Sequence, residues 1–146
     1  MKNNQLMIYG AYGYAGELMV REAVAQGLRP IIAGRDDEKL KPIATELSLE
    51  CRAFGVRNTG SNLQDISVLL NCAGPFSATA EPLARACLAQ QIHYLDITGE
   101  IDIFRKCHAL DEEARQQNVL ILPGAGTDIV PTDCLAAMLK EKLPVA

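Results

Sequence analysis

The sequence predicts a three-layer α/β protein, in which helices cover both faces of a six-stranded parallel sheet. Short apolar runs alternate with longer amphipathic stretches along all 146 residues. This alternation is typical of repeated β-α-β units, whose helices connect neighbouring parallel strands. Hydrophobic residues make up 49% of the chain and charged residues 22%, which is the composition of a globular domain rather than of a disordered chain.

In the first half of the chain, glycines and capping residues separate the predicted elements. Gly10 and Gly27 end the runs before them, and Asp36 or Asp37 can cap a helix. Pro42 comes early enough in that helix to be tolerated near its first turn. We expect strands at residues 6–9, 30–33 and 51–56, helices at residues 14–26 and from 36 or 37 to 47, and a short, weak helix at residues 58–65.

The same alternation continues in the second half. The run SVLLN at residues 67–71 is nearly all apolar, as expected of a strand covered on both faces. Pro82 is expected in the first turn of the helix that follows. We expect further strands at residues 93–97 and 119–122, and helices at residues 79–90, 101–117 and 132–143. The crossovers should be right-handed, and the expected strand order is 3-2-1-4-5-6.

Composition argues against several classes of partner. The net charge of −4 has the wrong sign for a general nucleic-acid or anionic-membrane binder. Aromatic residues make up only 5% of the chain and tryptophan is absent, so a base-stacking platform is not expected. No apolar run approaches the roughly 20 residues of a membrane span. Residues 1–5 lack the basic-then-apolar order of a signal peptide.

The cysteines indicate buried free thiols and a reducing compartment. Their number is odd, no pair is spaced as CxxC, and each lies among apolar or small residues. A disulfide framework and a metal site are therefore not expected, and we predict a cytoplasmic location. The five cysteines are Cys51, Cys72, Cys87, Cys107 and Cys134.

A glycine-rich loop follows the first strand and opens the first helix. Gly10, Gly13 and Gly16 form the pattern GxxGxxG. Such glycines permit a tight turn, a close approach of the backbone to a pyrophosphate, and close packing of helix on strand. The helix N-terminus favours the phosphate anion. The loop predicts a dinucleotide site of the Rossmann type, and the alternative is a plain strand–helix turn with incidental glycines.

The end of the second strand bears on the choice of cofactor. Arg35 can pair with a 2′-phosphate and stack on adenine, so we favour NADP(H) over NAD(H). Asp36 keeps NAD(H) open, because an acidic residue here can bind the ribose hydroxyls. The alternatives are a helix-capping role for Asp36 and a solvated surface charge for Arg35.

The sequence offers several candidates for residues near the reacting end of the cofactor. The small residues after the fourth strand, Asn71–Phe76, would let a dinucleotide cross the strand ends, or form an ordinary strand–loop junction. Asp96, Glu100 and Asp128 are carboxylates near the predicted strand ends. Each could act as a general acid or base, but a loop anchor or a turn residue is the favoured interpretation. Cys72 is expected beside the cofactor as a buried small residue. We assign no catalytic residue.

Five segments occur in an order that matches a known family: GAYGYAG, AGRDDEKL, NCAGPF, HYLDITGE and PGAGTDIVPTD. With these segments the chain resembles the NADP-binding domain of the saccharopine dehydrogenase family. It is most similar to the branch that contains trans-acting enoyl reductases and saccharopine-dehydrogenase-like oxidoreductases. The resemblance covers essentially all of residues 1–146, which we expect to form one NAD(P)-binding Rossmann domain.

The resemblance implies a role for several residues. It places Gly10, Tyr12, Gly13, Tyr14, Ala15 and Gly16 in the phosphate loop, Gly34 and Arg35 at the adenosine ribose, Ala73, Gly74 and Pro75 toward the nicotinamide, and Thr98, Gly99 and Glu100 on a loop that faces the cleft. It further implies a substrate and dimerisation domain after residue 146. A small-molecule substrate would bind through that domain, and a homodimer is compatible with the resemblance.

Three hypotheses follow. In the first, the chain is the NADP(H)-binding domain of an oxidoreductase that transfers hydride to or from a small molecule, and the 146 residues alone turn over poorly or not at all. In the second, it is a non-catalytic NADP(H) sensor whose occupancy tunes a protein contact. In the third, the fold is retained but the cofactor site is inactive.

Overall fold

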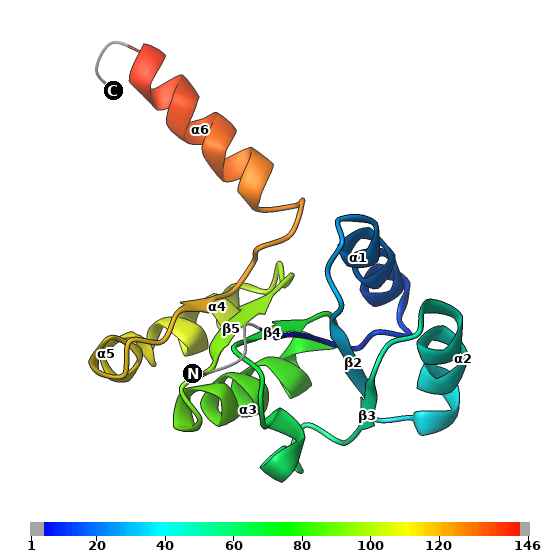
Figure 1. The fold of residues 1–146 in the computed structure, drawn as a ribbon. Helices are drawn as coiled ribbons and strands as arrows, with labels where there is room; N and C mark the ends of the chain where they lie inside the picture. The colour runs from blue at the N-terminus through cyan, green and yellow to red at the C-terminus, as the bar shows by residue number, and fades with distance from the viewer. Residues whose placement is uncertain (1–4, 144–146) are drawn as a thin grey trace.

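The computed structural model describes residues 5–143 and contains one parallel sheet in the predicted order, β3-β2-β1-β4-β5-β6 (Figure 1). The strands are β1 (Leu6–Tyr9), β2 (Ile31–Gly34), β3 (Cys51–Ala53), β4 (Val68–Asn71), β5 (His93–Asp96) and β6 (Ile121–Leu122). The helices are α1 (Tyr14–Ala25), α2 (Asp37–Leu47), α3 (Phe76–Ala89), α4 (Ile101–His108), α5 (Asp111–Gln116) and α6 (Val130–Lys142), and a 3₁₀ turn, η1, spans Gly60–Leu63.

The central strand β1 is buried on both faces. Met7 pairs with Ile31 of β2 on one side and with Leu69 of β4 on the other. The Met7 and Ile8 side chains point to opposite faces, and both are closed to solvent. An all-apolar strand at the centre of a parallel sheet is expected, because helices cover both of its faces.

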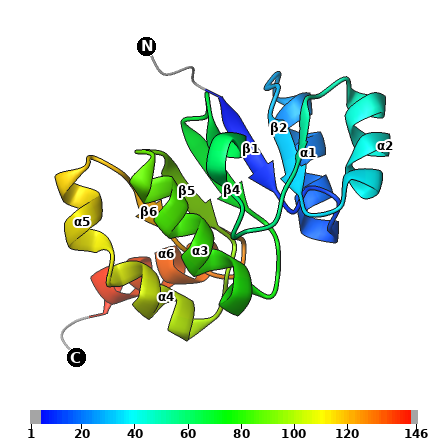
Figure 2. The ribbon, with the colours of Figure 1, turned by 90° about the horizontal axis from the view of Figure 1, so that it is seen from below.

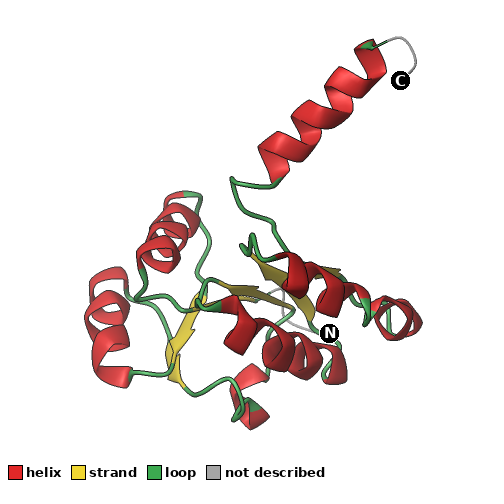
Figure 3. Ribbon diagram, turned by 180° about the vertical axis from the view of Figure 1, so that it is seen from behind, coloured by secondary structure: helices red, strands yellow, loops and turns green. Residues whose placement is uncertain are grey.

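Two separate cores result from this alternation. Ile8 and Ile32 pack with α1 and α2 on one face of the sheet. Met7 and Leu69 pack with α3, α4 and α5 on the other face. Figure 2 shows the two groups of helices on opposite sides of the strands, and Figure 3 shows them from behind. The cores fix the sheet, whose carboxyl edge carries the loops described below.

Asp36 caps the helix that follows β2. Its carboxylate accepts a hydrogen bond from the Lys39 amide at 3.3 Å, which satisfies one of the free amides in the first turn of α2. The capping role weighed for Asp36 is therefore confirmed. Pro42 lies in the second turn of this helix.

Three predicted elements near the cleft have different bounds in the structure. The strand expected at residues 51–56 ends at Ala53, because Ala53 pairs with Gly34 and β2 ends there. The weak helix expected at residues 58–65 is only the 3₁₀ turn η1. The helix expected from residue 79 begins at Phe76, which places Pro82 in its second turn rather than its first. The distant Glu100 carboxylate accepts the Phe76 amide and so caps this earlier start.

The single helix expected at residues 101–117 is two helices. The chain turns at Ala109 and Leu110, between α4 and α5. Leu110 and Ala114 are both buried, because the turn directs the second helix back against the core. The strand expected at residues 119–122 is shortened to β6, since only Ile121 and Leu122 pair with β5.

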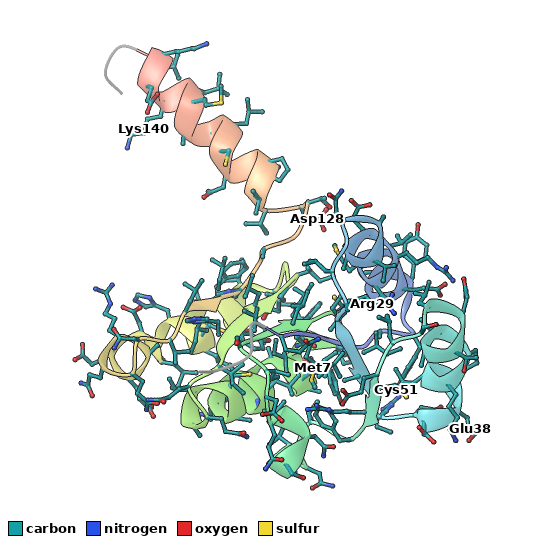
Figure 4. All side chains as sticks on the ribbon, in the orientation of Figure 1. Met7, Arg29, Glu38, Cys51, Asp128 and Lys140 are labelled. Atoms are coloured by element: carbon teal, nitrogen blue, oxygen red, sulfur yellow. The ribbon has the colours of Figure 1, made fainter. Side chains whose placement is uncertain are left out.

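Helix α6 projects away from the sheet and its helices (Figures 1 and 3). All of Val130–Lys142 is exposed, including Leu135, Met138 and Leu139, which are more than half accessible. Figure 4 labels Asp128 near the base of this helix and Lys140 toward its far end. The apolar positions predicted for this helix are present, but they pack against nothing in the described chain.

Candidate functional site

A cleft of about 530 Å³ lies at the carboxyl ends of β1, β2, β3 and β4. Its walls are the segments that follow these strands. Parallel sheets bind ligands at this edge, where loops from neighbouring strands diverge. The lining residues are Tyr9, Gly10, Tyr12, Gly13, Gly34, Arg35, Gly55, Val56, Arg57, Cys72, Ala73, Gly74, Pro75, Ala78 and Thr79.

Gly10 lets the loop after β1 approach the loop after β4. Its φ of +86° is unfavourable for any other residue, and a Cβ here would lie 2.7 Å from the Ala73 amide nitrogen. Gly16 has a different role, because a Cβ there would overlap the Gly10 carbonyl. Gly16 is thus a packing residue that brings α1 close to β1, and Gly10 sets the floor of the cleft.

The N-terminus of α1 is left without a side-chain cap. Gly13 is the N-cap residue, and no side chain accepts a hydrogen bond from the first amides of the helix. Those amides have no intrahelical partner, and the helix dipole makes this end positive. Because Gly13 itself lines the cleft, this end of α1 is suited to a phosphate group.

Tyr12 and Gly34 pack against each other in the wall between β1 and β2. A Cβ on Gly34 would lie 2.6 Å from Cε1 of the Tyr12 ring, so only glycine leaves room for this ring position. The Lys39 ammonium lies 5.6 Å from the centroid of the same ring, within the range of a cation–π contact. The Tyr12 ring and Arg35, which follows Gly34, line the same cleft.

The loop after β4 is organised by hydrogen bonds to its own side chains. The Asn71 carboxamide oxygen accepts the Ala73 amide at 3.0 Å, and the Thr79 hydroxyl donates to the Ala73 carbonyl at 2.6 Å. The Asn71 amide group in turn donates to the Thr79 hydroxyl at 3.1 Å. These bonds hold the small residues Ala73 and Gly74 in the cleft wall.

A buried polar network continues from Asn71 to the loops after β5 and β6. Asn71 donates to the Tyr94 hydroxyl at 3.1 Å, and that hydroxyl donates to Asp96. Asp96 is closed to solvent, and its other oxygen accepts the amides of Thr98 at 3.0 Å and Gly124 at 2.9 Å. Asp96 therefore anchors two loops, as the favoured interpretation of this residue expected.

The other candidate carboxylates also lie outside the cleft wall. Glu100 caps α3 through the Phe76 amide at 3.0 Å. Asp128 is exposed before α6, where its backbone carbonyl accepts the Thr132 hydroxyl at 2.8 Å. Among residues 5–143, no group of three or more His, Cys, Asp or Glu side chains is placed to hold a metal ion.

Cys72 lines the cleft as a protonated thiol. It is 8% exposed, and burial, followed by the charge of Asp96, raises its pKa to about 12. Burial likewise raises the pKa of the Tyr9 hydroxyl, which donates to the Phe54 carbonyl at 2.9 Å. Neither group is set up to lose a proton at neutral pH, so both serve as walls rather than as nucleophile or base.

Only some of the predicted site residues line the cleft. Eight predicted residues line it: Gly10, Tyr12, Gly13, Gly34, Arg35, Ala73, Gly74 and Pro75. Six do not line it: Tyr14, Ala15, Gly16, Thr98, Gly99 and Glu100. Tyr14 is 87% exposed, and Thr98 is buried where its hydroxyl accepts the Glu100 amide. A binding role for these six stays a prediction.

Residues after β3 were missed. Gly55, Val56 and Arg57 line the cleft, but the sequence interpretation placed the first two inside a strand. The signal was the glycine at position 55, because a glycine inside a strand pattern suggests a bulge or a close approach of the backbone. Ala78 and Thr79 were missed because the start of α3 was set too late.

The cleft fits a dinucleotide with a phosphorylated ribose. Gly10, Gly13 and Gly34 leave backbone without side chains on its floor, and the first amides of α1 have no side-chain partner. Arg35 and Arg57 add two cations at the end of the cleft beside β2 and β3. These are the groups that would hold a pyrophosphate and a 2′-phosphate.

The family model described as the saccharopine dehydrogenase NADP binding domain matches residues 6–122. The chain belongs to this family. NADP(H) is accordingly its cofactor.

Individual relatives agree with the assignment. The saccharopine dehydrogenase-like oxidoreductase of Rattus norvegicus is 27% identical to this chain, over 88% of this chain and 35% of the rat protein. The protein of the same name from Homo sapiens is 24% identical, over 94% of this chain and 38% of the human protein. A Mycobacterium tuberculosis protein named as a trans-acting enoyl reductase is 27% identical over 88% of this chain and 33% of its own. This chain therefore spans about a third of the length of these relatives.

The fold agrees with a solved structure as well. Saccharopine dehydrogenase from Saccharomyces cerevisiae superposes with a TM-score of 0.81 over 96% of this chain and 31% of its own, at 12% identity. At this identity the likeness concerns the fold. Together with the sheet order, it establishes the Rossmann fold for this member of the saccharopine dehydrogenase NADP-binding family.

Proposed function

We propose that this NADP-binding domain serves an oxidoreductase that transfers hydride between NADP(H) and a small molecule. The single observation that supports this best is the cleft beside β1, where a glycine-rich loop and an uncapped helix end meet two arginines. The bound cofactor would supply the hydride at the nicotinamide ring. The chain would supply binding, orientation of the ring and exclusion of water.

Each part of the cofactor has a proposed position. The Gly10–Gly16 loop holds the pyrophosphate at the start of α1, and Arg35 holds the 2′-phosphate. Ala73, Gly74 and Pro75 lie on the nicotinamide side, where the bonds from Asn71 and Thr79 fix the backbone. Small residues there let the ring lie flat across the strand ends.

The substrate pocket is proposed to lie largely outside these residues. Relatives are about three times as long as this chain, which covers 35% and 38% of the rat and human proteins. Within the described cleft, Tyr9 and Cys72 retain their protons at neutral pH. A proton donor for the reaction would then come from the substrate or from a further domain, which is also where a homodimer contact is proposed.

The same observation favours a second candidate, a non-catalytic NADP(H) sensor. A cleft that binds the cofactor, without a catalytic acid or base assigned to its walls, is sufficient for sensing. The two candidates separate when the full-length gene product is tested for NADPH oxidation with enoyl, imine and keto substrates. Turnover with any of them supports the enzyme, and binding without turnover across the panel supports the sensor.

A cytoplasmic location is also proposed, and the free cysteines support it. Two relatives have names that point elsewhere: a lipid droplet localized protein in Caenorhabditis elegans and a mitochondrial oxidoreductase in Arabidopsis thaliana. No helix within residues 5–143 is long and apolar enough to span a bilayer. Fluorescence microscopy of the tagged full-length protein tests the location.

The experiment that tests the cofactor site places a carboxylate at the start of α1. Gly13→Asp fills the space beside the uncapped amides and adds a negative charge, so NADPH binding is expected to be lost. Leu28→Asp adds the same charge at the other end of α1, where Leu28 is 51% exposed, and binding should persist. Equal affinity of the two variants in a calorimetric titration contradicts the proposed site.

A further inference from the structure

Arg35 and Arg57 differ from every other arginine of the chain. Each of the others bonds a carboxylate or a backbone carbonyl, whereas Arg35 and Arg57 have no such partner within residues 5–143. Both line the same cleft. The partnered arginines are Arg21, Arg29, Arg52, Arg85, Arg105 and Arg115.

The two arginines reach the cleft from neighbouring strands. Arg35 directly follows Gly34, the last residue of β2, and Gly34 pairs with Ala53, the last residue of β3. The Phe54 amide donates to the Gly34 carbonyl at 2.9 Å, which continues the contact one residue beyond the strand. The segment that leads to Arg57 therefore starts beside Arg35.

The turn that presents Arg57 is held in place from several sides. The Tyr9 hydroxyl donates to the Phe54 carbonyl at 2.9 Å, and the centroids of these two rings lie 5.1 Å apart. The Asn58 amide donates to the Gly55 carbonyl at 2.8 Å, which closes a turn around Val56 and Arg57. A turn anchored in this way positions the guanidinium at the cleft at little entropic cost.

Among residues 5–143, no carboxylate is paired with either of these cations. Asp36, the acidic residue next to Arg35, caps α2 and pairs with the Lys39 ammonium at 3.5 Å. Two unpaired guanidinium groups in one cleft repel each other, and an anion that binds between them relieves this repulsion. A phosphate monoester offers two negative charges and several acceptor oxygens, which two planar guanidinium groups can each bind bidentately.

We propose that Arg57 is a second specificity-determining residue for the 2′-phosphate, and that it holds this group together with Arg35. The inference rests on the proposed cofactor position. It assigns the pyrophosphate to the start of α1 and the 2′-phosphate to the arginine pair, because the pair lies on the β2–β3 side of the glycine loop. Preference for NADP(H) over NAD(H) then depends on two loops rather than on the β2 end alone.

Two small nucleotides isolate this contact. Adenosine 2′,5′-bisphosphate carries the 2′-phosphate, and ADP lacks it but retains the 5′-diphosphate. The unsubstituted protein is expected to bind both. Arg57→Gln should weaken adenosine 2′,5′-bisphosphate about ten- to a hundred-fold, as expected for a lost charge-assisted contact, and should leave ADP within about two-fold.

Matched variants control for charge and folding. Arg115→Gln removes the same charge from α5, which lies toward the opposite edge of the sheet, and should change neither affinity (Figure 2). Arg57 is exposed and has no partner in the described part of the chain, so Arg57→Gln should keep the thermal unfolding midpoint of the parent. In Arg35→Gln/Arg57→Gln, the combined loss should differ from the product of the single losses, because both groups bind one phosphate.

The outcomes separate the inference from the proposed function. If Arg57→Gln weakens both nucleotides equally or neither, Arg57 does not bind the 2′-phosphate and the inference is wrong, while the cofactor site stands. If the unsubstituted protein binds neither nucleotide, both the site and the inference fail. Selective loss of adenosine 2′,5′-bisphosphate supports both.

Discussion

The Tyr94 hydroxyl donates a hydrogen bond of 2.8 Å to the Asp96 carboxylate, and both residues are closed to solvent. The same hydroxyl accepts the Asn71 amide group, so it joins the loop after β4 to the loops after β5 and β6. Burial and the adjacent carboxylate raise the pKa of Tyr94, which keeps the hydroxyl protonated as the donor. This chain of hydrogen bonds couples the β4 side of the cleft to the far half of the sheet.

Tyr94→Phe should therefore destabilise the protein. The substitution leaves one buried Asp96 oxygen without its donor, and such a loss costs roughly 1–3 kcal/mol. Urea unfolding measures the change. Tyr14→Phe removes the same hydroxyl from a side chain that is 87% exposed, and should change stability by less than about 0.5 kcal/mol. Equal effects of the two substitutions would count against the network.

Gly10→Ala should be among the most damaging single substitutions in the glycine loop. The alanine backbone would have to keep a φ of +86°, and its Cβ would lie 2.7 Å from the Ala73 amide nitrogen. Strain and overpacking together should lower the free energy of unfolding by about 2 kcal/mol or more. Gly99→Ala is the control, since nothing lies within 4 Å of its Cβ position. A stable Gly10→Ala protein would mean that the two loops do not meet as described.

Stability should decline at alkaline pH. Burial raises the pKa of Cys87 to about 12, against an ordinary value of 9.0, so the unfolded chain loses this proton first as the pH rises. The contribution of the Cys87 thiol to the free energy of unfolding is fully present below pH 9. It is lost between pH 9 and 12, at up to about 1.4 kcal/mol per pH unit. Urea unfolding from pH 8 to 10.5 should show the decline.

Variants assign that decline to a particular thiol. Cys87→Ala should make the pH dependence shallower, because it removes one buried group whose pKa differs between the folded and unfolded states. Cys134→Ala should leave the slope unchanged, since Cys134 is exposed in α6. A shallower slope in the Cys134 variant, or an unchanged slope in the Cys87 variant, would contradict the assignment.

Removal of residues 130–146 should leave the sheet and its cores intact. Every residue from Val130 to Lys142 is exposed, so the truncation removes no buried contact that the structure describes. The free energy of unfolding should change by less than about 0.5 kcal/mol. Urea unfolding of the shortened and full chains compares them directly, and a loss of several kcal/mol would show that α6 packs on the domain.

Much of the fold was predictable because local patterns agree with tertiary packing. The all-apolar LMIY run of β1 is buried on both faces, and the glycines at 10, 13 and 16 follow it in the expected strand–turn–helix setting. Where the sequence failed, a distant contact decided the outcome. Glu100 caps α3 from 24 residues away, and burial of Leu110 turns the chain between α4 and α5.

The site was predictable where a local sequence pattern marks it. Gly10 and Gly13 belong to the glycine loop, and Arg35 follows the next predicted strand. Arg57 could not be found in that way, because its place in the cleft depends on the pairing of Gly34 with Ala53. The loop-anchor role of Asp96 was favoured from sequence, but its partner Gly124 comes from a separate segment.

The most direct test of the NADP(H) site is a calorimetric titration of the protein with NADPH and with NADH, repeated for Arg35→Ala. We expect one site that prefers NADPH, and a preference that largely disappears in Arg35→Ala because a charge-assisted phosphate contact is lost. An unchanged preference in the variant would contradict the role of Arg35. Absence of binding of either nucleotide at millimolar concentration would contradict the site itself.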